Sequence, residues 1–434
     1  MTKLDLSSPR AYMDSARSLA RRLLSPYGSV SEVESDLETL NRYPGLDALE
    51  EPGSVRFLEE EGGDLESLGK EAVLEGSVYW EHTAAGEATR LGLGPKFFLK
   101  PEDLLRESPE GTPESAPSPG EGALIPLELG RRHLFQLVYE LKKLAHEAGE
   151  DPLRVLSRQK MLVVAAGEGA LGLVSLVAKD FRELLPSGSL HFMIQRAFPG
   201  LARRENTWDY DPDSPPRLHN HGAMVMQKTM DGQIFTEKED GGRVYLSRGE
   251  YLAEMEKFKD LVSYNIEDLD YLTRALDFAA LGLAVKKRGE YGMMMEIVAN
   301  NPERPVKGGC LARDPALKKD VMIESFRLQG YRPEDIRFLN KNFNHYLHPA
   351  RLLETLRREG LFMPLAVRDG RVHFQPVQGD MNFLENTLFF ARKKTAPLNS
   401  LKSRADIPAA LEAFAAQDAQ PGFRETVGEL VAGA

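Results

Sequence analysis

The residues best suited to do chemistry lie in a glycine-rich loop at positions 83–98, TAAGEATRLGLGPKFF. Gly86 has no Cβ, so the main chain there can take up a positive φ and approach a ligand closely. Arg90 carries a guanidinium that can contact phosphate oxygens in a fork, and Lys96 adds a second positive charge. The loop is neither a P-loop nor a G-x-G-x-x-G dinucleotide loop. It can hold phosphates, but the same residues also fit a tight turn with two surface cations.

Alternating strands and helices are expected to position this loop. Apolar runs predict strands at 72–82, 160–166, 189–195, 260–266 and 290–299. Helical periodicity occurs between these runs, at 129–149 and from Leu269 to about Lys287. The alternation predicts an α/β fold of Rossmann-like type, with a mixed, mostly parallel sheet and helices on both faces. In such a fold the ligand lies beyond the carboxyl ends of the strands.

Changes in composition divide the chain into three segments. Residues 1–70 are predicted to be a mainly helical N-terminal region, in which Ser8 caps a helix that starts at Pro9. Residues 71–337 are predicted to form the main α/β domain, and residues 338–434 a small α+β part. Within the main domain, the proline-rich stretch near 101–122 has few apolar side chains and predicts a mobile surface insertion.

Composition limits the partners of the chain. The net charge of −11 over 434 residues argues against a nucleic-acid binder. A single cysteine, Cys310, excludes an internal disulfide framework and fits a reducing compartment. No apolar run approaches the ~20 residues that a membrane span needs. We therefore expect a cytoplasmic protein without nucleic-acid or membrane partners, whose oligomeric state the sequence does not reveal.

Seven short segments resemble, in order along the chain, the motifs of the sugar-nucleotide pyrophosphorylases. The first is the loop itself, whose TRLG and PK match the family's Thr-Arg-Leu-Gly and Pro-Lys. The others are SLHFMIQRAFPGL, SPPRLHNHGAM, LVSYNIEDL, MEIVANNPERPVKGGCLA, FLNKNFNHYL and SLKSRADI. The resemblance covers about residues 77–407 and is to the uridylyltransferase branch, the UDP-glucose and UDP-N-acetylglucosamine pyrophosphorylases, as a remote member. It implies a nucleotide-diphospho-sugar transferase fold of GT-A-like type.

The reaction implied by this resemblance joins UTP and a sugar 1-phosphate, either glucose 1-phosphate or N-acetylglucosamine 1-phosphate, into a UDP-sugar and pyrophosphate. The attacking phosphate oxygen is already anionic, so positioned cations and a metal ion matter more than a general base. The sequence offers four candidate catalytic cations, each inside a family-like motif: Arg90, Lys96, Lys307 and Lys402. Any one lysine, taken without its motif, would more often be a solvated surface charge.

The resemblance also implies which residues bind the nucleotide and the sugar. The predicted nucleotide-binding residues are Ala85, Gly86, Gln195, His221 and Gly222. The predicted sugar-binding residues are Glu296, Gly308, Asn340 and Asn342. His221 would also fit an ordinary surface loop, and asparagines are ordinary turn formers.

A magnesium ion is implied at the end of the strand at 260–266. Glu267 stands where the family has Asp, and Asp268 follows it. Either carboxylate could hold Mg²⁺, which prefers one or two carboxylates together with substrate oxygens and water. Asp268 could instead simply cap the helix that begins at Leu269.

Departures from the family pattern leave two other functions open. Ala84, Ala85 and Ala88 stand where the family favours glycine, and an Ala forced to positive φ costs on the order of 1 kcal/mol. The altered loop is compatible with a UDP-sugar-binding or nucleotide-binding protein that has lost catalysis. A glycosyltransferase using a finished UDP-sugar would need a D-x-D-like metal site, for which IEDLD offers Glu267, Asp268 and Asp270.

Overall fold

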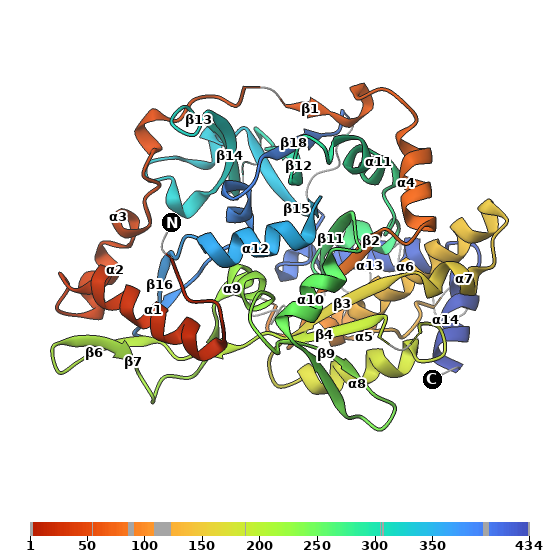
Figure 1. Cartoon of the computed structure of the whole chain (residues 1–434), viewed down its shortest axis with the longest axis horizontal. Helices are drawn as coiled ribbons and strands as arrows, with labels where there is room; N and C mark the ends of the chain where they lie inside the picture. Colours follow the sequence, from red (N-terminus) through yellow and green to blue (C-terminus); the bar gives the residue numbers. More distant parts are fainter. Residues whose placement is uncertain are drawn as a thin grey trace.

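The structure is a computed structural model that describes residues 3–53, 55–85, 91–107, 123–186, 188–303, 305, 308–393 and 399–432, with only the backbone at 342. A large twisted sheet runs through the molecule, and helices lie on both of its faces (Figure 1). This arrangement confirms the predicted α/β fold class. Within the described residues, no helix is long and apolar enough to cross a membrane.

Four parallel strands form the centre of the twelve-stranded sheet. They are β11 (Asp260–Asn265), β2 (Val78–Thr83), β3 (Lys160–Ala165) and β4 (Leu190–Ile194), in that spatial order. Each is an apolar run, as expected of strands buried on both faces. Because all four run in the same direction, their carboxyl ends meet at one edge of the sheet.

The remaining strands extend the sheet on both sides. Beyond β4 lie β9 (Ile234–Glu237) and β10 (Arg243–Leu246), and β9 is antiparallel to both of its neighbours. Beyond β11 lies β15 (Phe338–Tyr346), which is antiparallel to both β11 and β12 (Met293–Ala299). The series continues with β18 (Thr387–Ala391) and β1 (Arg56–Phe57), while β13 (Gly309–Asp314) and β14 (Lys319–Glu324) branch from β15. Strands from all three predicted segments therefore share one sheet; the division into domains stays a prediction.

Two smaller sheets lie outside the main one. β16 (Leu365–Arg368), β17 (Arg371–Phe374), β6 (Leu201–Arg204) and β7 (Thr207–Tyr210) form an antiparallel sheet. β5 (Ala197–Phe198) pairs with β8 (Arg217–Leu218). β16 and β17 thus provide strands of the C-terminal part at 338–434, which was predicted to contain both strands and helices.

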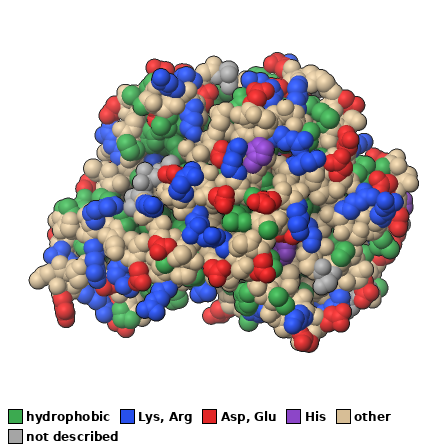
Figure 2. All heavy atoms as spheres, in the orientation of Figure 1, with side chains coloured by type: hydrophobic (Ala, Val, Ile, Leu, Met, Phe, Trp, Pro, Cys, Tyr) green, Lys and Arg blue, Asp and Glu red, His purple; other side chains and the backbone are tan. Residues whose placement is uncertain are grey.

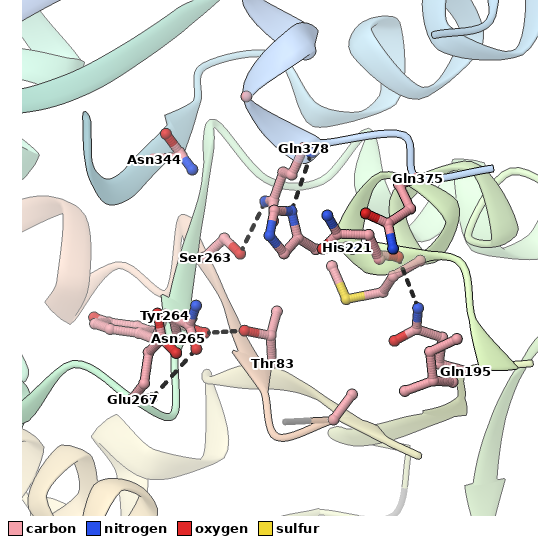
Figure 3. A pocket seen from close by; sticks show the side chains of 15 residues that line it. Thr83, Gln195, His221, Ser263, Tyr264, Asn265, Glu267, Asn344, Gln375 and Gln378 are labelled. Carbon is pink, nitrogen blue, oxygen red and sulfur yellow. Dashed lines mark hydrogen bonds between the residues drawn. The ribbon is translucent and has the colours of Figure 1, made fainter. Parts of the chain in front are cut away.

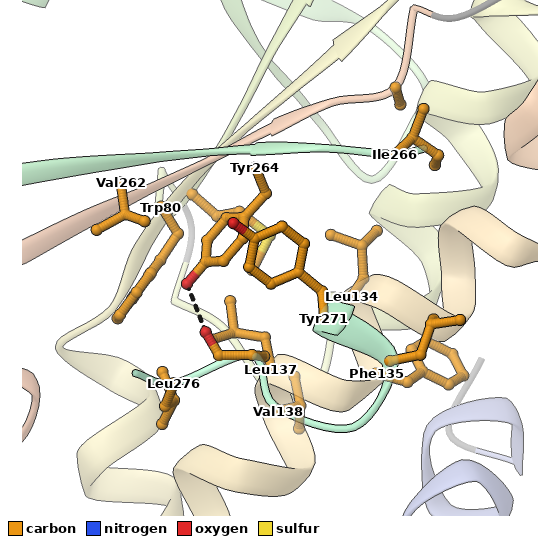
Figure 4. Packing of buried hydrophobic residues seen from close by; sticks show 14 of the residues in the cluster. Trp80, Leu134, Phe135, Leu137, Val138, Val262, Tyr264, Ile266, Tyr271 and Leu276 are labelled. Atoms are coloured by element: carbon orange, nitrogen blue, oxygen red, sulfur yellow. Dashed lines mark hydrogen bonds between the residues drawn. The ribbon is translucent and has the colours of Figure 1, made fainter. Parts of the chain in front are cut away.

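Alternate side chains along the central strands pack into two separate hydrophobic cores, because successive residues of a strand point to opposite faces of the sheet. Trp80, Val163 and Tyr264 belong to the first core, part of which is shown in Figure 4. The helices that pack there are α4 (Leu65–Leu74), α6 (Leu129–Ala148), α8 (Ala170–Phe181), α11 (Phe278–Lys287), α13 (Ile407–Asp418) and α14 (Phe423–Ala432). Tyr79 and Leu162 belong to the second core, which is covered by α1 (Pro9–Leu24), α9 (Asn220–Gln227), α10 (Arg248–Met255) and α12 (Pro349–Glu359).

Some local predictions are confirmed and others need correction. Ser8 caps α1 by accepting a hydrogen bond from the backbone N–H of Ala11. The strand expected at 72–82 begins only at Val78, because α4 continues to Leu74 and Gly76 then turns the chain at φ +71°. The helix expected from Leu269 is interrupted: a short 3-10 turn, Leu269–Leu272, precedes α11. The predicted insertion starts as helix α5 (Pro101–Glu107), and its remainder lies outside the described residues.

Candidate functional site

A polar cavity of about 390 Å³ opens at the carboxyl ends of the central strands (Figure 3). Thr83 is the last residue of β2, Asn265 is the last of β11, and Gln195 directly follows β4. The other lining residues are Ala85, Leu218, Asn220, His221, Met224, Ser263, Tyr264, Glu267, Asn344, Gln375, Gln378 and Gly379. The cavity therefore lies beyond the carboxyl ends of the strands, where the strand pattern predicted a ligand to bind.

Two of the predicted catalytic lysines meet the predicted metal ligand beside this cavity. The Lys96 Nζ lies 2.8 Å from one carboxylate oxygen of Glu267, and the Lys402 Nζ lies 3.3 Å from the other. Burial alone would raise the pKa of the Glu267 carboxyl, but the charges of Lys402 and Lys96 outweigh burial and lower it. The Lys402 side chain is 39% exposed, whereas that of Lys96 is only 7% exposed. Segments more than 100 residues apart thus build one charged cluster, which we call the lysine–glutamate triad.

Asp268, the second predicted metal ligand, turns away from the cavity. Its carboxylate accepts a hydrogen bond from the backbone N–H of Asp270 at 3.1 Å and caps the turn that begins at Leu269. Burial and the nearby charge of Asp270 raise the pKa of Asp268 to about 7. The capping alternative is thus the one that the structure shows for this side chain.

A metal ion at the cavity could therefore use one carboxylate of the protein as a ligand. Within the described residues, no group of three His, Cys, Asp or Glu side chains is arranged to hold a metal ion. Glu267 is the single acidic side chain among the described lining residues. One carboxylate fits Mg²⁺ that arrives with a phosphate substrate, since this ion takes most of its ligands from phosphates and water.

His221 faces the cavity at the start of α9, next to Asn220, whose φ is +59°. The Nδ1 atom of His221 accepts a hydrogen bond from the backbone N–H of Gln378 at 3.2 Å. Desolvation by the surrounding walls lowers the pKa of His221, although its side chain remains exposed, and the charge of Lys402 lowers it further against the opposing effect of Glu267. The neutral ring therefore carries its proton on Nε2 and presents a donor to a ligand.

Gln195 and Gly222 hold the wall around His221 in place. The Gln195 side-chain amide donates to the carbonyl oxygen of Asn220 at 2.9 Å, which leaves its own oxygen able to accept from a ligand (Figure 3). A Cβ on Gly222 would lie 2.4 Å from the carbonyl carbon of Pro376, so only glycine lets α9 approach this segment so closely. Gly222 thus acts through the backbone rather than through a side chain.

The remaining predicted residues differ in where the structure places them. Ala85 lines the cavity. Gly86, Arg90 and Lys307 lie outside the described residues, and so does the side chain of Asn342. Glu296 is buried and pairs with Arg392 at 2.9 Å and Lys341 at 3.5 Å, away from the cavity lining.

Asn340 lies on the β12–β15 side of the cavity, where Glu324 joins it. Gly308 directly precedes β13, and a Cβ there would lie 3.1 Å from the Leu339 side chain. A Cβ on Gly379, a lining residue, would be 3.5 Å from the Glu324 carboxylate and 3.9 Å from the Asn340 amide nitrogen. Burial, together with the charge of Asp380, raises the pKa of Glu324 to about 7. Glu324 is absent from the sequence prediction because nothing near it in the chain marks a site.

Asn344 is a second residue that the sequence analysis missed, although it lies in the quoted FLNKNFNHYL motif. The side chain is 4% exposed and lines the cavity, and its Oδ1 atom has no hydrogen-bond partner among the described residues. A buried carbonyl oxygen without a partner is rare in proteins and costs about 1–3 kcal/mol. A ligand that donates a hydrogen bond in the cavity would satisfy it.

A buried ion pair lies directly beneath the cavity. Lys228, which follows α9, pairs with Glu81 of β2, and both side chains are at most 1% exposed. The Ser263 hydroxyl donates to Glu81 at 2.8 Å, and the side-chain amide of Gln378 donates to Ser263 at 3.3 Å (Figure 3). This buried pair fixes the orientation of Ser263 and Gln378, two lining residues.

Comparison with known proteins finds similarity to solved structures, and not to family models or curated sequences. No protein-family model matches the sequence, and no curated protein matches it. Among solved structures, the chain is similar to a UDP-N-acetylglucosamine pyrophosphorylase from Trypanosoma brucei, with a TM-score of 0.60, 14% identity, and coverage of 91% of this chain and 79% of that one. It is also similar to a UDP-glucose phosphorylase from the same organism, with a TM-score of 0.56, 14% identity, and coverage of 92% and 79%.

A third similar structure is a putative UDP-N-acetylglucosamine pyrophosphorylase from Entamoeba histolytica, with a TM-score of 0.54, 15% identity, and coverage of 81% and 83%. The chain shares its fold with these three structures. The resemblance drawn from the sequence motifs is therefore confirmed at the level of fold.

Proposed function

We propose that the protein is a nucleotidyltransferase that makes a UDP-sugar and pyrophosphate from UTP and a sugar 1-phosphate. The lysine–glutamate triad is the observation that carries this proposal. It brings Lys96 and Lys402 to the carboxyl ends of the central strands, where an α/β fold binds its ligand. A cavity with cations at one side and uncharged amides elsewhere suits a substrate with phosphates at one end and hydroxyls or a base at the other.

In the proposed reaction, these residues bind the anionic substrates and align them. When UTP enters, Lys96 and Lys402 exchange the Glu267 carboxylate for phosphate oxygens, which neutralises charge as pyrophosphate leaves. The sugar phosphate oxygen attacks without a general base, because it is already anionic. Arg90 and Lys307 are proposed to assist from the glycine-rich loop and the VKGG segment, on the basis of their motifs.

Magnesium is the proposed cofactor, and it would reduce the charge repulsion between the two substrates when bound. Glu267 would hold it, since this carboxylate is released when the two lysines turn to the phosphates. Asp268 is left out of this proposal because it caps a turn.

Uncharged side chains, together with Glu324, are proposed to select the two ends of the substrate. The Nε2–H of His221 and the amide oxygen of Gln195 form a donor and acceptor pair for the uracil edge. Asn344, Asn340 and Glu324 would contact the sugar, since they lie on the β15 side of the cavity.

The test is pyrophosphate release from UTP and Mg²⁺, with glucose 1-phosphate and N-acetylglucosamine 1-phosphate as alternative acceptors. We expect release that depends on the sugar phosphate and that falls at least about a hundredfold in Lys402→Ala. Lys238→Ala is the matched control, because Lys238 is exposed and its side chain makes no ion pair in the described structure. Absence of release with both sugar phosphates, in a folded protein, would refute the proposal.

The alanine-substituted loop supports a second candidate, a protein that binds UDP-sugars without turning them over. Calorimetry separates the two: tight UDP-sugar binding without metal dependence or pyrophosphate release would favour the binding protein. A glycosyltransferase has less support, because Asp268 is a cap and Asp270 pairs with Lys341 at 3.2 Å.

A further inference from the structure

A second cavity, of about 720 Å³, lies apart from the candidate active site. Its walls come from residues 3–6, from α10 and from α12. It shares no lining residue with the first cavity. Thr229 lies in its wall just after α9, whose other end carries His221, so α9 connects the two cavities.

The rim of this second cavity is basic although the chain as a whole is acidic. Four cationic side chains line it, and only two carboxylates, Asp5 and Glu354, accompany them; the cations are Lys3, Arg248, Arg357 and Arg358. This excess of positive charge contrasts with the net charge of −11. Figure 2 shows Lys and Arg side chains over the middle of the face on which α10 and α12 lie in Figure 1.

Most of these cations form no close ion pair, although the charge of Arg357 contributes to lowering the pKa of the Asp5 carboxyl in the same wall. Within the described residues, Lys3, Arg248 and Arg357 form no salt bridge within 4 Å. The Nε atom of Arg248 is buried and has no hydrogen-bond partner there. Arg358 does pair, with Glu359 at 2.7 Å. A buried guanidinium N–H without an acceptor indicates a place for an anion.

Apolar side chains form another part of the wall. Leu4, Leu6 and Leu353 are buried, and Leu252 lies beside them. A cavity of this size is within the range of small-molecule sites, which combine an apolar lining with a few polar groups. The combination suits an anion that carries an apolar or planar body.

We propose that this second cavity binds a small organic phosphate, with its phosphates on Arg248 and Arg357 and its body against the leucines. Such a site is separate from the proposed catalytic reaction and does not depend on it. Bidentate guanidinium contacts match phosphate oxygens, and two arginines on different helices would clamp them from two sides.

The test uses calorimetry on the full chain carrying Lys402→Ala, which weakens phosphate binding at the candidate active site. ATP is one probe and inorganic pyrophosphate the other, at about 0.15 M salt so that exposed charges are screened. We expect ATP to bind more tightly than pyrophosphate, since only ATP offers a body to the leucines. Adding Arg248→Ala and Arg357→Ala should weaken ATP binding at least tenfold.

Two controls keep the result interpretable. Arg22→Ala removes one exposed arginine far along α1 and should leave binding unchanged. Arg248→Lys with Arg357→Lys retains the charge but loses the guanidinium forks, so it should bind ATP more weakly than the wild type and more tightly than the alanine pair. Failure of ATP to bind, equal affinity for ATP and pyrophosphate, or binding insensitive to the arginine pair would overturn the assignment.

Discussion

Two ion-pair clusters share the same chemistry but differ in their access to the cavity, one lying beneath it and the other beside it. The pair of Lys228 and Glu81 is closed off beneath the cavity, with both side chains at most 1% exposed. The lysine–glutamate triad stands beside the cavity, and its Lys402 side chain is 39% exposed. The buried pair keeps its partners permanently, whereas the triad can exchange carboxylate oxygens for those of a ligand.

Access to the cavity therefore distinguishes an ion pair that stabilises the fold from one that can bind a ligand. Removing one member of a buried ion pair leaves an uncompensated charge in the protein interior, which is strongly destabilising. An ion pair with solvent access contributes little to stability, because water and salt screen it. Mutation of the buried pair should therefore change folding, and mutation of the triad should change activity.

The largest effect is expected for Lys228→Met. This change leaves the Glu81 carboxylate buried and unpaired, at a cost of about 3–5 kcal/mol in the free energy of unfolding. Denaturant unfolding followed by circular dichroism measures it. Adding Glu81→Gln should recover much of the loss, and a single variant as stable as the wild type would show that the pair is not needed for folding.

Lys402→Ala should show the opposite pattern. We expect at least a hundredfold loss of pyrophosphate release, which corresponds to about 2.7 kcal/mol of transition-state stabilisation. Its melting temperature should match that of Lys238→Ala, the exposed control. A large drop in melting temperature would mean that the triad, like the buried pair, is structural.

Two buried histidines extend the comparison to pH. Burial lowers the pKa of both His82 and His133 to about 3, from 6.5 in the unfolded chain. Between these values the unfolded chain binds more protons, so stability is fully present above pH 6.5 and is lost as the pH falls toward 3. Each histidine therefore lowers the free energy of unfolding by about 2 kcal/mol at pH 5 relative to pH 7.5.

His133→Phe should remove one such contribution. The difference in unfolding free energy between the variant and the wild type should shift by about 2 kcal/mol in favour of the variant when the pH is lowered from 7.5 to 5. The matched control is His146→Phe, on the same helix but exposed, for which we expect no such gain. An equal response in both variants would contradict burial as the cause.

The smallest effect is expected for Asn344→Leu. Removing a buried oxygen that has no partner should leave the unfolding free energy unchanged or slightly higher. Affinity for a UDP-sugar should fall about tenfold, or about 1.4 kcal/mol, because a contact in the cavity is lost. Unchanged affinity in calorimetry would place Asn344 outside the binding site.

Much of the fold could be predicted from local pattern. The strands β3, β4 and β11 are mainly apolar runs, and α1 has a serine cap followed by proline, so each is specified by neighbouring residues. Lys96, Lys402 and Glu267 could also be named, because each lies in a recognisable motif. Their meeting in one cluster was expected from the fold and is shown by two distances.

Other features could not be predicted, because they depend on contacts between distant segments. Asp268 and Glu267 are adjacent and chemically alike, yet one caps a turn and the other faces the cavity. The pairing of Glu81 with Lys228 joins residues 147 positions apart. Nothing in the residues around either one marks it as buried.

The sequence by itself determined the order of strands and helices, the edge of the sheet at which a ligand would bind, and the charged residues near it. The elements and the edge follow from periodicity and from the geometry of parallel strands, whereas the charged residues were named from the motifs that resemble those of the pyrophosphorylase family. Only the tertiary structure decided which charges are closed off and which can reach a ligand. Burial depends on the packing of elements that are remote in the chain, and it is burial that makes one lysine a structural residue and another a candidate for catalysis.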